Sequence, residues 1–459
     1  MTSLYDWSYW FCEAWLVPLM TPLLYFQEHI MPPFSNPAGD MARWMESDPG
    51  LNILAWTIVV NVALMIGFTN VIIVVYLERK IAGRIMDRRG PMLSLSSLKE
   101  IASDLAGYAP EYNWKTTTYA GIGILQNVAD GIKFFCKEII VPDKADRLLY
   151  TIGPVIFISS SILLLVMVPF SPRIAASSAP LGLLVVMAAF SIAPIGVLTT
   201  GWACNNKYTL IGGIRSAAQL TAYEIPLLVT VLAVAVLSGS MNIIEIVEFQ
   251  MDMDGWTLFL LPLGAALFLI TMIAEVERIP FDMPEAEAEL VEGWWTEYGG
   301  LRWGLLFMAE YLRAYAACLL FAIFFLGGWE PFGGNLVAQY TAFIPGIAWL
   351  LIKSWLMFAV FVWVRASLHR VRTDQILEFG WRWLLPLSLV NLGIAVWLRL
   401  WVWQGEVWSP LVPGIITAIA VALFVLLAID EDPESLEGRE RPYSVHVKAG
   451  PAGPGTHKK

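Results

Sequence analysis

The sequence predicts an all-α polytopic membrane protein, because its composition, its apolar runs and the placement of its basic residues all indicate this class. Of the 459 residues, 57% are hydrophobic and 15% are charged, and the mean hydropathy is +0.63. Soluble domains carry about 25% charged residues. A chain this apolar is expected to place most of its surface in a lipid bilayer.

Nine apolar runs approach or exceed the ~20 residues that a helix needs to cross a bilayer. They lie at about 53–77, 148–170, 181–202, 217–238, 257–275, 304–326, 342–364, 383–402 and 410–429. Another apolar stretch, 7–26, is interrupted by Glu13, Pro18 and Pro22. We expect it to lie at the membrane interface, within an N-terminal segment of residues 1–50.

Basic residues set the predicted orientation. If the loop after the first run is cytoplasmic, the cytoplasmic segments together hold 24 of the 29 Lys and Arg residues. Cytoplasmic loops of membrane proteins carry such an excess. We therefore expect an N-terminus outside and a cytoplasmic C-terminus.

Two amphipathic surface helices are predicted on the cytoplasmic side. Residues 124–138 place apolar side chains on one stripe and polar ones on the opposite face, which is typical of a helix lying on a membrane surface. Ser97 and Glu100 form a capping-box pattern at the start of a short helix, 98–106. The tail, 430–459, is rich in Glu, Arg, Gly and Pro, so it is predicted to be disordered.

The most acidic segment is the run AEVERIPFDMPEAEAELVEGWWTEYGG, residues 274–300. It holds eight carboxylates and one base, Arg278, between two apolar runs. Clustered carboxylates raise one another's pKa and can exchange protons near neutral pH. Beside a membrane they indicate a proton pathway or a docking surface. A solvated face is the alternative, but Phe281, Trp294 and Trp295 alternate with the charges and disfavour it.

Charged residues also lie inside the predicted spans. Glu224 lies roughly 10 Å into its helix, shortly before a proline. Glu310 and Arg313 are three residues apart, so they share a helix face and can pair. Lys353 lies near the middle of the seventh run. Charges at such depth usually mark ion or proton pathways, and static pairing is the alternative for each of them.

Nothing in the sequence indicates a redox centre or metal on this chain. The four cysteines and four histidines lack the spacing of a ligand cluster. A glycine-rich dinucleotide fingerprint is also missing. We expect no FMN, iron–sulfur cluster or metal on this chain, and no nucleic-acid partner.

The acidic run and several motifs around it resemble the NuoH (subunit 1) family of respiratory complex I, NADH:quinone oxidoreductase. These motifs are ERKIAGRIMDRRGP (78–91), GILQNVADGIKFFCKE (123–138), NKYTLIGGIRSAAQLTAYEIP (206–226), AEYLRA (309–314), FFLGGW (324–329) and RASLHRVRTDQILEFGWRWLLPLSLVN (365–391). The likeness covers about residues 55–400 in unbroken order. It implies an eight-helix family core in a membrane domain, 51–405, to which 406–429 adds a ninth transmembrane helix.

The resemblance implies a membrane subunit of a proton-translocating NADH:quinone oxidoreductase, a translocase subunit that is not catalytic alone. It would form the membrane part of the quinone chamber and couple quinone reduction to proton pumping, with quinone as the substrate of a shared site. The implied partners are the peripheral-arm quinone-site and terminal iron–sulfur subunits, small membrane subunits, quinone and the lipid bilayer. The implied location is a prokaryotic inner (cell) membrane.

The matched motifs imply roles for individual residues. Relay or coupling carboxylates are implied at Glu224, Glu285, Glu287 and Glu289. Arg278, Phe281 and Asp282 would line the quinone chamber, and Arg79 and Lys80 would lie near its entrance. Contacts with other subunits are implied for Glu297, Arg365, Arg370, Arg372 and Asp374.

The chain also departs from the family pattern. About 28 residues, 92–119, are inserted, and we expect them to contact another subunit. Glu277 stands where the family commonly has Asn and Glu292 where a small residue is common, so a relay role is least expected for these two.

Two other classes stay open. The chain could be the equivalent subunit of a membrane-bound hydrogenase or of a dehydrogenase fed by reduced deazaflavin or ferredoxin, because the donor modules of such complexes lie on other chains. A stand-alone transporter is favoured less, since no inverted repeat is evident.

Overall fold

The computed structural model describes residues 48–87, 90–91, 126–170, 180–253, 255–284, 287–331 and 346–403. Within these ranges the chain forms helices joined by turns and loops, without a strand, which confirms the predicted all-α class. Some predictions fall outside the described residues. They concern the interfacial segment 7–26, the insert 92–119 with its short helix, the extra helix 406–429 and the tail 430–459.

The helices follow one another in a simple order. They are α4 (Asp48–Ile85), α6 (Gln126–Cys136), α7 (Arg147–Met167), α8 (Gly182–Ala203), α9 (Lys207–Ser238), α10 (Ile243–Asp252), α11 (Thr257–Leu260), α12 (Pro262–Glu275), α13 (Glu287–Leu290), the 3₁₀-helix η3 (Gly293–Trp295), α14 (Gly300–Phe325), α16 (Gly346–Ser367), α17 (Thr373–Glu378), the π-helix η4 (Phe379–Leu384) and α18 (Leu385–Trp403).

Six helices of the described part are long and apolar enough to cross a membrane: α7, α8, α9, α14, α16 and the continuous helix from α17 through η4 into α18. The first predicted run lies inside α4, which has 38 residues. The predicted surface helix 124–138 is α6. The protein is therefore a multi-pass membrane protein, as its composition indicated.

The predicted run 257–275 is not one continuous helix. It is divided into α11 and α12, because the backbone leaves the helical conformation at Leu261 (φ −127°, ψ 65°). Pro262 then begins α12, where its missing N–H and fixed φ are tolerated. With 14 residues, α12 is only about 21 Å long. The prediction of one continuous helix over this run is wrong.

Polar caps fix the ends of the long helices. The side chain of Asp146 accepts hydrogen bonds from the N–H groups of Leu148 and Leu149 at the start of α7. Asn206 caps the start of α9 through the N–H of Tyr208, and Gly239 ends the helix in the left-handed region (φ 77°). Such caps satisfy backbone groups that the helix itself leaves free.

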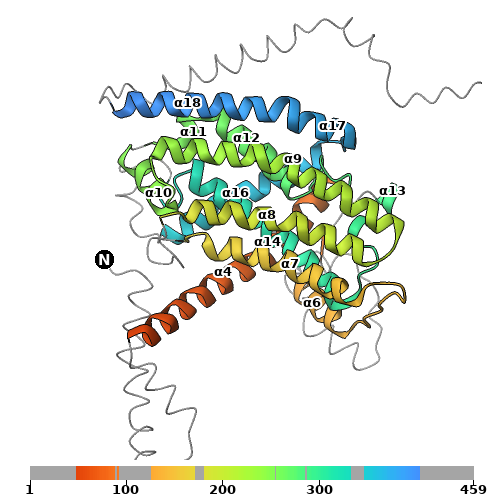
Figure 1. Ribbon diagram of the computed structural model, residues 1–459. Coiled ribbons are helices and arrows are strands. Elements are labelled where there is room, and N and C mark those ends of the chain that lie inside the picture. The colour runs from red at the N-terminus through yellow and green to blue at the C-terminus, as the bar shows by residue number, and fades with distance from the viewer. Residues whose placement is uncertain are drawn as a thin grey trace, which may run out of the picture.

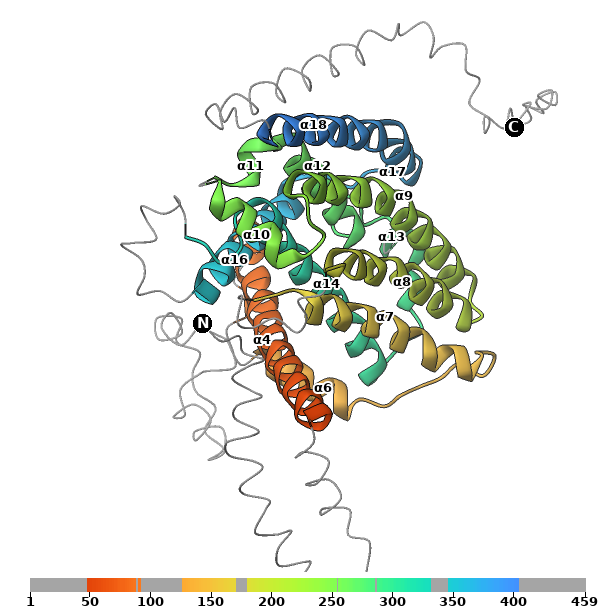
Figure 2. The same cartoon turned by 60° about the vertical axis from the view of Figure 1, so that its left-hand side comes forward.

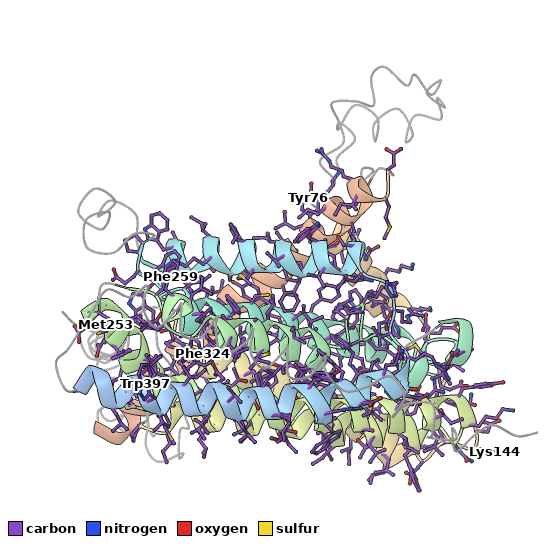
Figure 3. All side chains as sticks on the ribbon, turned by 90° about the horizontal axis from the view of Figure 1, so that it is seen from above. Tyr76, Lys144, Met253, Phe259, Phe324 and Trp397 are labelled. Atoms are coloured by element: carbon purple, nitrogen blue, oxygen red, sulfur yellow. The ribbon has the colours of Figure 1, made fainter. Side chains whose placement is uncertain are left out.

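The long helices run alongside one another in a bundle. Helices α7, α8, α9 and α18 lie side by side in this order, and α14 and α16 pack behind them (Figure 1). α4 crosses obliquely beside α14 and α16 (Figure 2). α14 is the central helix: 89% of the residues in its most apolar window are buried, against 28% for the helix that contains α18. Phe324 of α14 accordingly lies inside the bundle, whereas Trp397 of α18 lies at its edge (Figure 3).

The two ends of the bundle carry different loops. α6, α13 and α17 gather at one end, and α10 and α11 lie at the other (Figure 1). Lys144 marks the first end, opposite Met253 and Phe259 (Figure 3). Segments predicted to share the cytoplasmic side therefore lie together.

The acidic run is folded against the bundle at the first of these ends. Phe281, Leu290, Trp294 and Trp295 are buried, which contradicts a fully solvated face. Trp294 approaches α9 so closely that a Cβ at Gly212 would lie 2.8 Å from its backbone nitrogen. Only glycine permits this approach.

Candidate functional site

Arg278 lies at the centre of a cluster of charges that joins four parts of the chain. Its Nη2 lies 2.8 Å from Oε1 of Glu310 on α14, and its Nη1 lies 3.9 Å from Oε1 of Glu78 on α4. Glu78 also pairs with Arg365 of α16. The Arg278 guanidinium lies 4.5 Å from the centre of the Tyr311 ring. We call Glu78, Arg278, Glu310 and Arg365 the Arg278 cluster.

Asp282 and Phe281 continue the site beside this cluster. Arg370 Nη2 donates to Oδ2 of Asp282 at 2.8 Å. Burial raises the pKa of Asp282, and the nearby Arg370 opposes this rise. The centres of the Phe281 and Tyr223 rings lie 5.4 Å apart, and the Gln219 side-chain amide donates to the Phe281 carbonyl at 2.9 Å. The loop is thus held against α9.

A second buried ion pair lies deeper in the bundle. Arg313 Nη2 donates to Oε1 of Glu275 at 2.6 Å, and both side chains are at most 2% exposed. The pair that the spacing of Glu310 and Arg313 allowed is not the one formed, since each pairs with a residue outside α14. Their spacing places the two side chains next to each other on one helix face. Glu275 at the end of α12 and Arg278 in the loop after it nevertheless supply a closer partner to each.

Glu277 interacts electrostatically with members of both groups, Glu310 and Arg313. It is 6% exposed, and its Oε1 accepts a hydrogen bond from the hydroxyl of Ser216 on α9. Its φ of 54° is in the left-handed region. Burial raises the pKa of the Glu277 carboxyl to about 7.

Glu224, predicted as a relay carboxylate, lies on α9 and contacts α8. It is half-buried on α9 and accepts a hydrogen bond from the Ser191 hydroxyl of α8. Its charge acts electrostatically on Glu275. Glu275 thus connects Glu224 with the loop.

The other predicted relay carboxylates belong to the outer part of the acidic run. Glu285 lies outside the described residues, and only the backbone of Glu287, the first residue of α13, is described. Glu289 is 51% exposed and pairs with Arg215 at 2.9 Å. Among the described carboxylates of the run, Glu275 and Glu277 are thus buried, whereas Glu289 is half-exposed.

Arg79 and Lys80, predicted near a chamber entrance, lie where α4 meets α6. Arg79 Nη1 contacts Oδ2 of Asp130 at 2.6 Å and Oδ1 of Asn127 at 3.2 Å. The Lys80 ammonium lies 5.8 Å from the centre of the Tyr76 ring. The contacts of Arg79 hold the surface helix α6 against α4.

The five residues predicted to contact other subunits differ in their surroundings. Arg365 and Arg370 form ion pairs within the chain, with Glu78 and Asp282 respectively. Glu297 accepts from Asn206 Nδ2 at 2.7 Å. Arg372 and Asp374, in contrast, are 78% and 80% exposed, so they are open to a neighbouring chain.

A cavity of about 420 Å³ opens beside the loop. Its lining is mostly apolar and comprises Phe281, Val371, Gln375, Ile376, Glu378, Phe379 and Trp383. In the described part of the chain, His, Cys, Asp and Glu side chains form no group of three or more that could hold a metal ion. The site can therefore bind apolar or aromatic groups and exchange protons through its buried carboxylates.

Comparison with known proteins decides the family. The family described as NADH dehydrogenase matches residues 57–396. The chain belongs to this family. An NADH-quinone oxidoreductase subunit of Geobacillus kaustophilus (strain HTA426) is 38% identical over 370 residues, covering 79% of this chain and 99% of the relative. The equally named protein of Geobacillus thermodenitrificans (strain NG80-2) is 39% identical over 368 residues, covering 78% and 99%. The resemblance in the sequence motifs is confirmed.

Lys353 has a partner that the sequence did not indicate for this member of the NADH dehydrogenase family. Its Nζ donates to the backbone carbonyls of Leu326 at 2.5 Å, Gly328 at 3.1 Å and Glu330. These carbonyls follow the end of α14, where a cation is favoured by the helix dipole. Lys353 therefore holds the turn that ends the central helix.

Sequence reasoning missed Glu275 and Glu277 as principal site residues. Both stand in the acidic run, but nothing in their spacing distinguishes them from the exposed carboxylates that follow. Their burial depends on the turn after α12 and on contacts with Ser216 and Arg313 of other helices. One signal was present, namely that both directly follow an apolar run.

Proposed function

We propose that the chain is the membrane subunit of a proton-translocating NADH:quinone oxidoreductase, where it forms the membrane part of the quinone chamber and couples quinone reduction to proton pumping. Its relatives are named as NADH-quinone oxidoreductase subunits. The observation that carries the proposal is the series of buried and half-buried charges from the Arg278 cluster through Glu275 and Arg313 to Glu224. Such a series inside a membrane protein is a functional feature by default.

The proton path is proposed to run through carboxylates. Glu224 is its inner member, and Glu285, Glu287 and Glu289 belong to its outer, loop end. Replacement of Glu224 by Gln keeps the shape of the side chain and removes its titration. We expect lower proton pumping from that variant in an assembled complex, and normal pumping would remove Glu224 from the path.

The quinone is proposed to bind at the end of the bundle that carries the acidic run. Arg278, Phe281 and Asp282 would line the chamber, with Arg79 and Lys80 at its entrance. The support is a combination of cations, an aromatic ring and a carboxylate in one region, next to an apolar cavity. A quinone has an apolar tail and a headgroup with two carbonyl oxygens, which arginine N–H groups can recognise.

The electrons would arrive from partner subunits. The proposed partners are the peripheral-arm subunits that bind the quinone headgroup and the terminal iron–sulfur cluster, together with small membrane subunits. Exposed Arg372 and Asp374 at the same end would contact them, along with Glu297, Arg365 and Arg370. In this proposal the acidic run and the C-terminus lie on the cytoplasmic side of a prokaryotic cell membrane, and the N-terminus lies outside.

Purification in a mild detergent tests the assignment. We expect the chain to bring down flavin- and iron–sulfur-containing subunits and to support NADH-dependent quinone reduction. Recovery as an active monomer that transports a solute would contradict it. If the purified complex accepts electrons from hydrogen, reduced deazaflavin or ferredoxin instead of NADH, the chain is the equivalent subunit of a related assembly.

A further inference from the structure

We propose that Glu277 is an additional proton-holding residue that connects the Arg278 cluster with the buried Glu275–Arg313 pair. The inference rests on the proposed function and names a further residue of its proton path. It concerns a carboxylate that the sequence pattern alone ranked low.

The partners of the buried carboxylates set Glu277 apart. Among the described residues four carboxylates are buried, at positions 78, 275, 277 and 310. Three of them pair with arginines, whereas Glu277 accepts from the neutral hydroxyl of Ser216. A buried carboxylate without a direct ion pair favours its protonated form. Glu277 is therefore suited to hold a proton, although Arg313 acts on it electrostatically. Burial also raises the pKa of the neighbouring Glu275 carboxyl, to about 8.

The surroundings of Glu277 offer places for that proton to go. The charged groups that act on it are Glu310 and Arg313 from α14 and Asp282 from its own loop. Glu275 of α12 also interacts electrostatically with it. Oε2 of Glu275 is buried and has no hydrogen-bond partner. A buried carboxylate oxygen in this position can accept a proton.

The backbone gives no reason for a glutamate at this position. The φ of 54° places residue 277 in the left-handed region, which favours Gly, Asn and Asp. The contacts of the side chain must therefore account for the residue, and they lie with Ser216 and the neighbouring charges. Asn is a suitable replacement, because it fits the backbone and cannot titrate.

The proton balance is simple. On protonation Glu277 becomes a neutral carboxylic acid. On release it becomes a carboxylate that the Ser216 hydroxyl and Arg313 stabilise, and the proton passes to Glu275 on one side or Glu310 on the other. The pKa of about 7 that burial produces allows both states near neutral pH.

The test compares Glu277→Asn and Glu277→Gln with Glu292→Gln in the whole complex reconstituted into liposomes. Glu292 is exposed and stands in the same acidic run, so it is a matched control. Proton translocation and quinone reduction are measured in parallel across about pH 5.5–8.5, a window centred on the expected titration, together with the infrared band of protonated carboxyl groups. We expect the Glu277 variants to lose at least half of the protons moved per electron and one carboxyl band that titrates near pH 7. The control should match the wild type.

Ser216→Ala provides a second, milder variant. Loss of the hydroxyl removes a group that stabilises the carboxylate, so the carboxyl band should persist to higher pH than in the wild type. This shift of the carboxyl band tests the role of Glu277 even if the Glu277 variants fail to assemble. An unchanged proton yield and an unchanged carboxyl band in the Glu277 variants would overturn the inference, as would a band in Ser216→Ala that titrates as in the wild type. Failure of the wild-type complex to pump protons during quinone reduction would instead overturn the proposed function.

Discussion

Arg313 and Glu275 form an ion pair of 2.6 Å in which both side chains are almost completely buried. The guanidinium lies near the rings of Phe157 and Phe190, at 5.4 and 5.6 Å. An ion pair in apolar surroundings loses its hydration, so each charge depends on the other. The pair joins α14 to the end of α12, where the acidic run begins.

The two partners of this pair should respond differently to neutralisation. Glu275→Gln leaves a buried guanidinium that cannot lose its proton, so we expect a cost of about 3–5 kcal/mol. Arg313→Met leaves a carboxylate that can take up a proton, so the loss should be smaller. Thermal inactivation of the assembled complex measures both. Arg382→Met, at an exposed pair with Glu378, is the control and should cost less than about 1 kcal/mol. A larger loss for Arg313→Met than for Glu275→Gln would contradict this account.

The contacts of Arg278 predict that a positive charge at this position is not by itself sufficient for full quinone reductase activity. Its guanidinium contacts Glu310, approaches Glu78 and stacks on Tyr311. A lysine cannot make all three contacts, so Arg278→Lys should lower quinone reductase activity about tenfold, equivalent to ~1.4 kcal/mol. Arg278→Glu should lower it further by placing a third carboxylate among the others. Steady-state kinetics of the complex decides, and equal activity of the lysine variant and the wild type would show that charge alone suffices.

The contact between Arg79 and Asp130 predicts an effect on quinone binding. It ties α4 to α6 at the proposed chamber entrance. Reversal of either charge should raise the KM for quinone several-fold, and the double reversal Arg79→Asp with Asp130→Arg should restore part of the loss, because the pair is worth about 1 kcal/mol. No recovery in the double variant would mean that the individual positions matter more than their pairing.

The contacts of Lys353 predict a structural effect at the C-terminal end of α14. Lys353→Met removes the donor of three backbone carbonyls, so we expect a loss of at least about 3 kcal/mol and little assembled complex. Native gel electrophoresis of solubilised membranes measures this. Ile352→Met, at an exposed neighbouring position, should assemble normally. If Lys353→Met assembles as well as this control, the lysine is not required for the turn.

Glu277 predicts a dependence of stability on pH. Burial raises its pKa from 4.5 to about 7, so the folded protein holds the proton more tightly than the unfolded chain between these values. The free energy of unfolding therefore contains a contribution that is complete below about pH 4.5 and is lost as pH rises to about 7. The wild type should lose more thermal stability than Glu277→Gln between about pH 5 and 7.5. Parallel curves for the two proteins would exclude this titration.

Much of the architecture could be predicted from the local pattern of the sequence. Apolar runs of sufficient length located α7, α8, α9, α14 and α16. Periodicity identified α6, whose Val128, Ile132 and Phe135 are exposed on one side as expected of a surface helix. The break at Leu261 was missed, because a proline at the first turn of a helix gives no sign of a gap before it in an otherwise apolar run.

The site was predicted less completely, because pairing depends on the packing of segments that are distant in the sequence. Glu310 and Arg313 are neighbours on one helix, yet their partners come from the end of α12 and the loop after it. Lys353 was considered for a carboxylate partner, but the described contacts lead to backbone carbonyls at the end of α14. The partner of each charged side chain therefore depends on where the turns after α12 and α14 place the backbone and the neighbouring side chains.

Hydropathy, charge asymmetry and ordered motifs are local properties of the chain, so they suffice to identify a multi-pass helical membrane protein of the NuoH family of complex I. Which acidic residues are buried depends instead on contacts between distant segments. The turn after α12 places Glu275 and Glu277 among Arg313, Ser216 and the Arg278 cluster, while Glu289 stays half-exposed on the same run. Burial removes water from a carboxylate, and that environment, not the residue type, determines whether it can hold a proton near neutral pH.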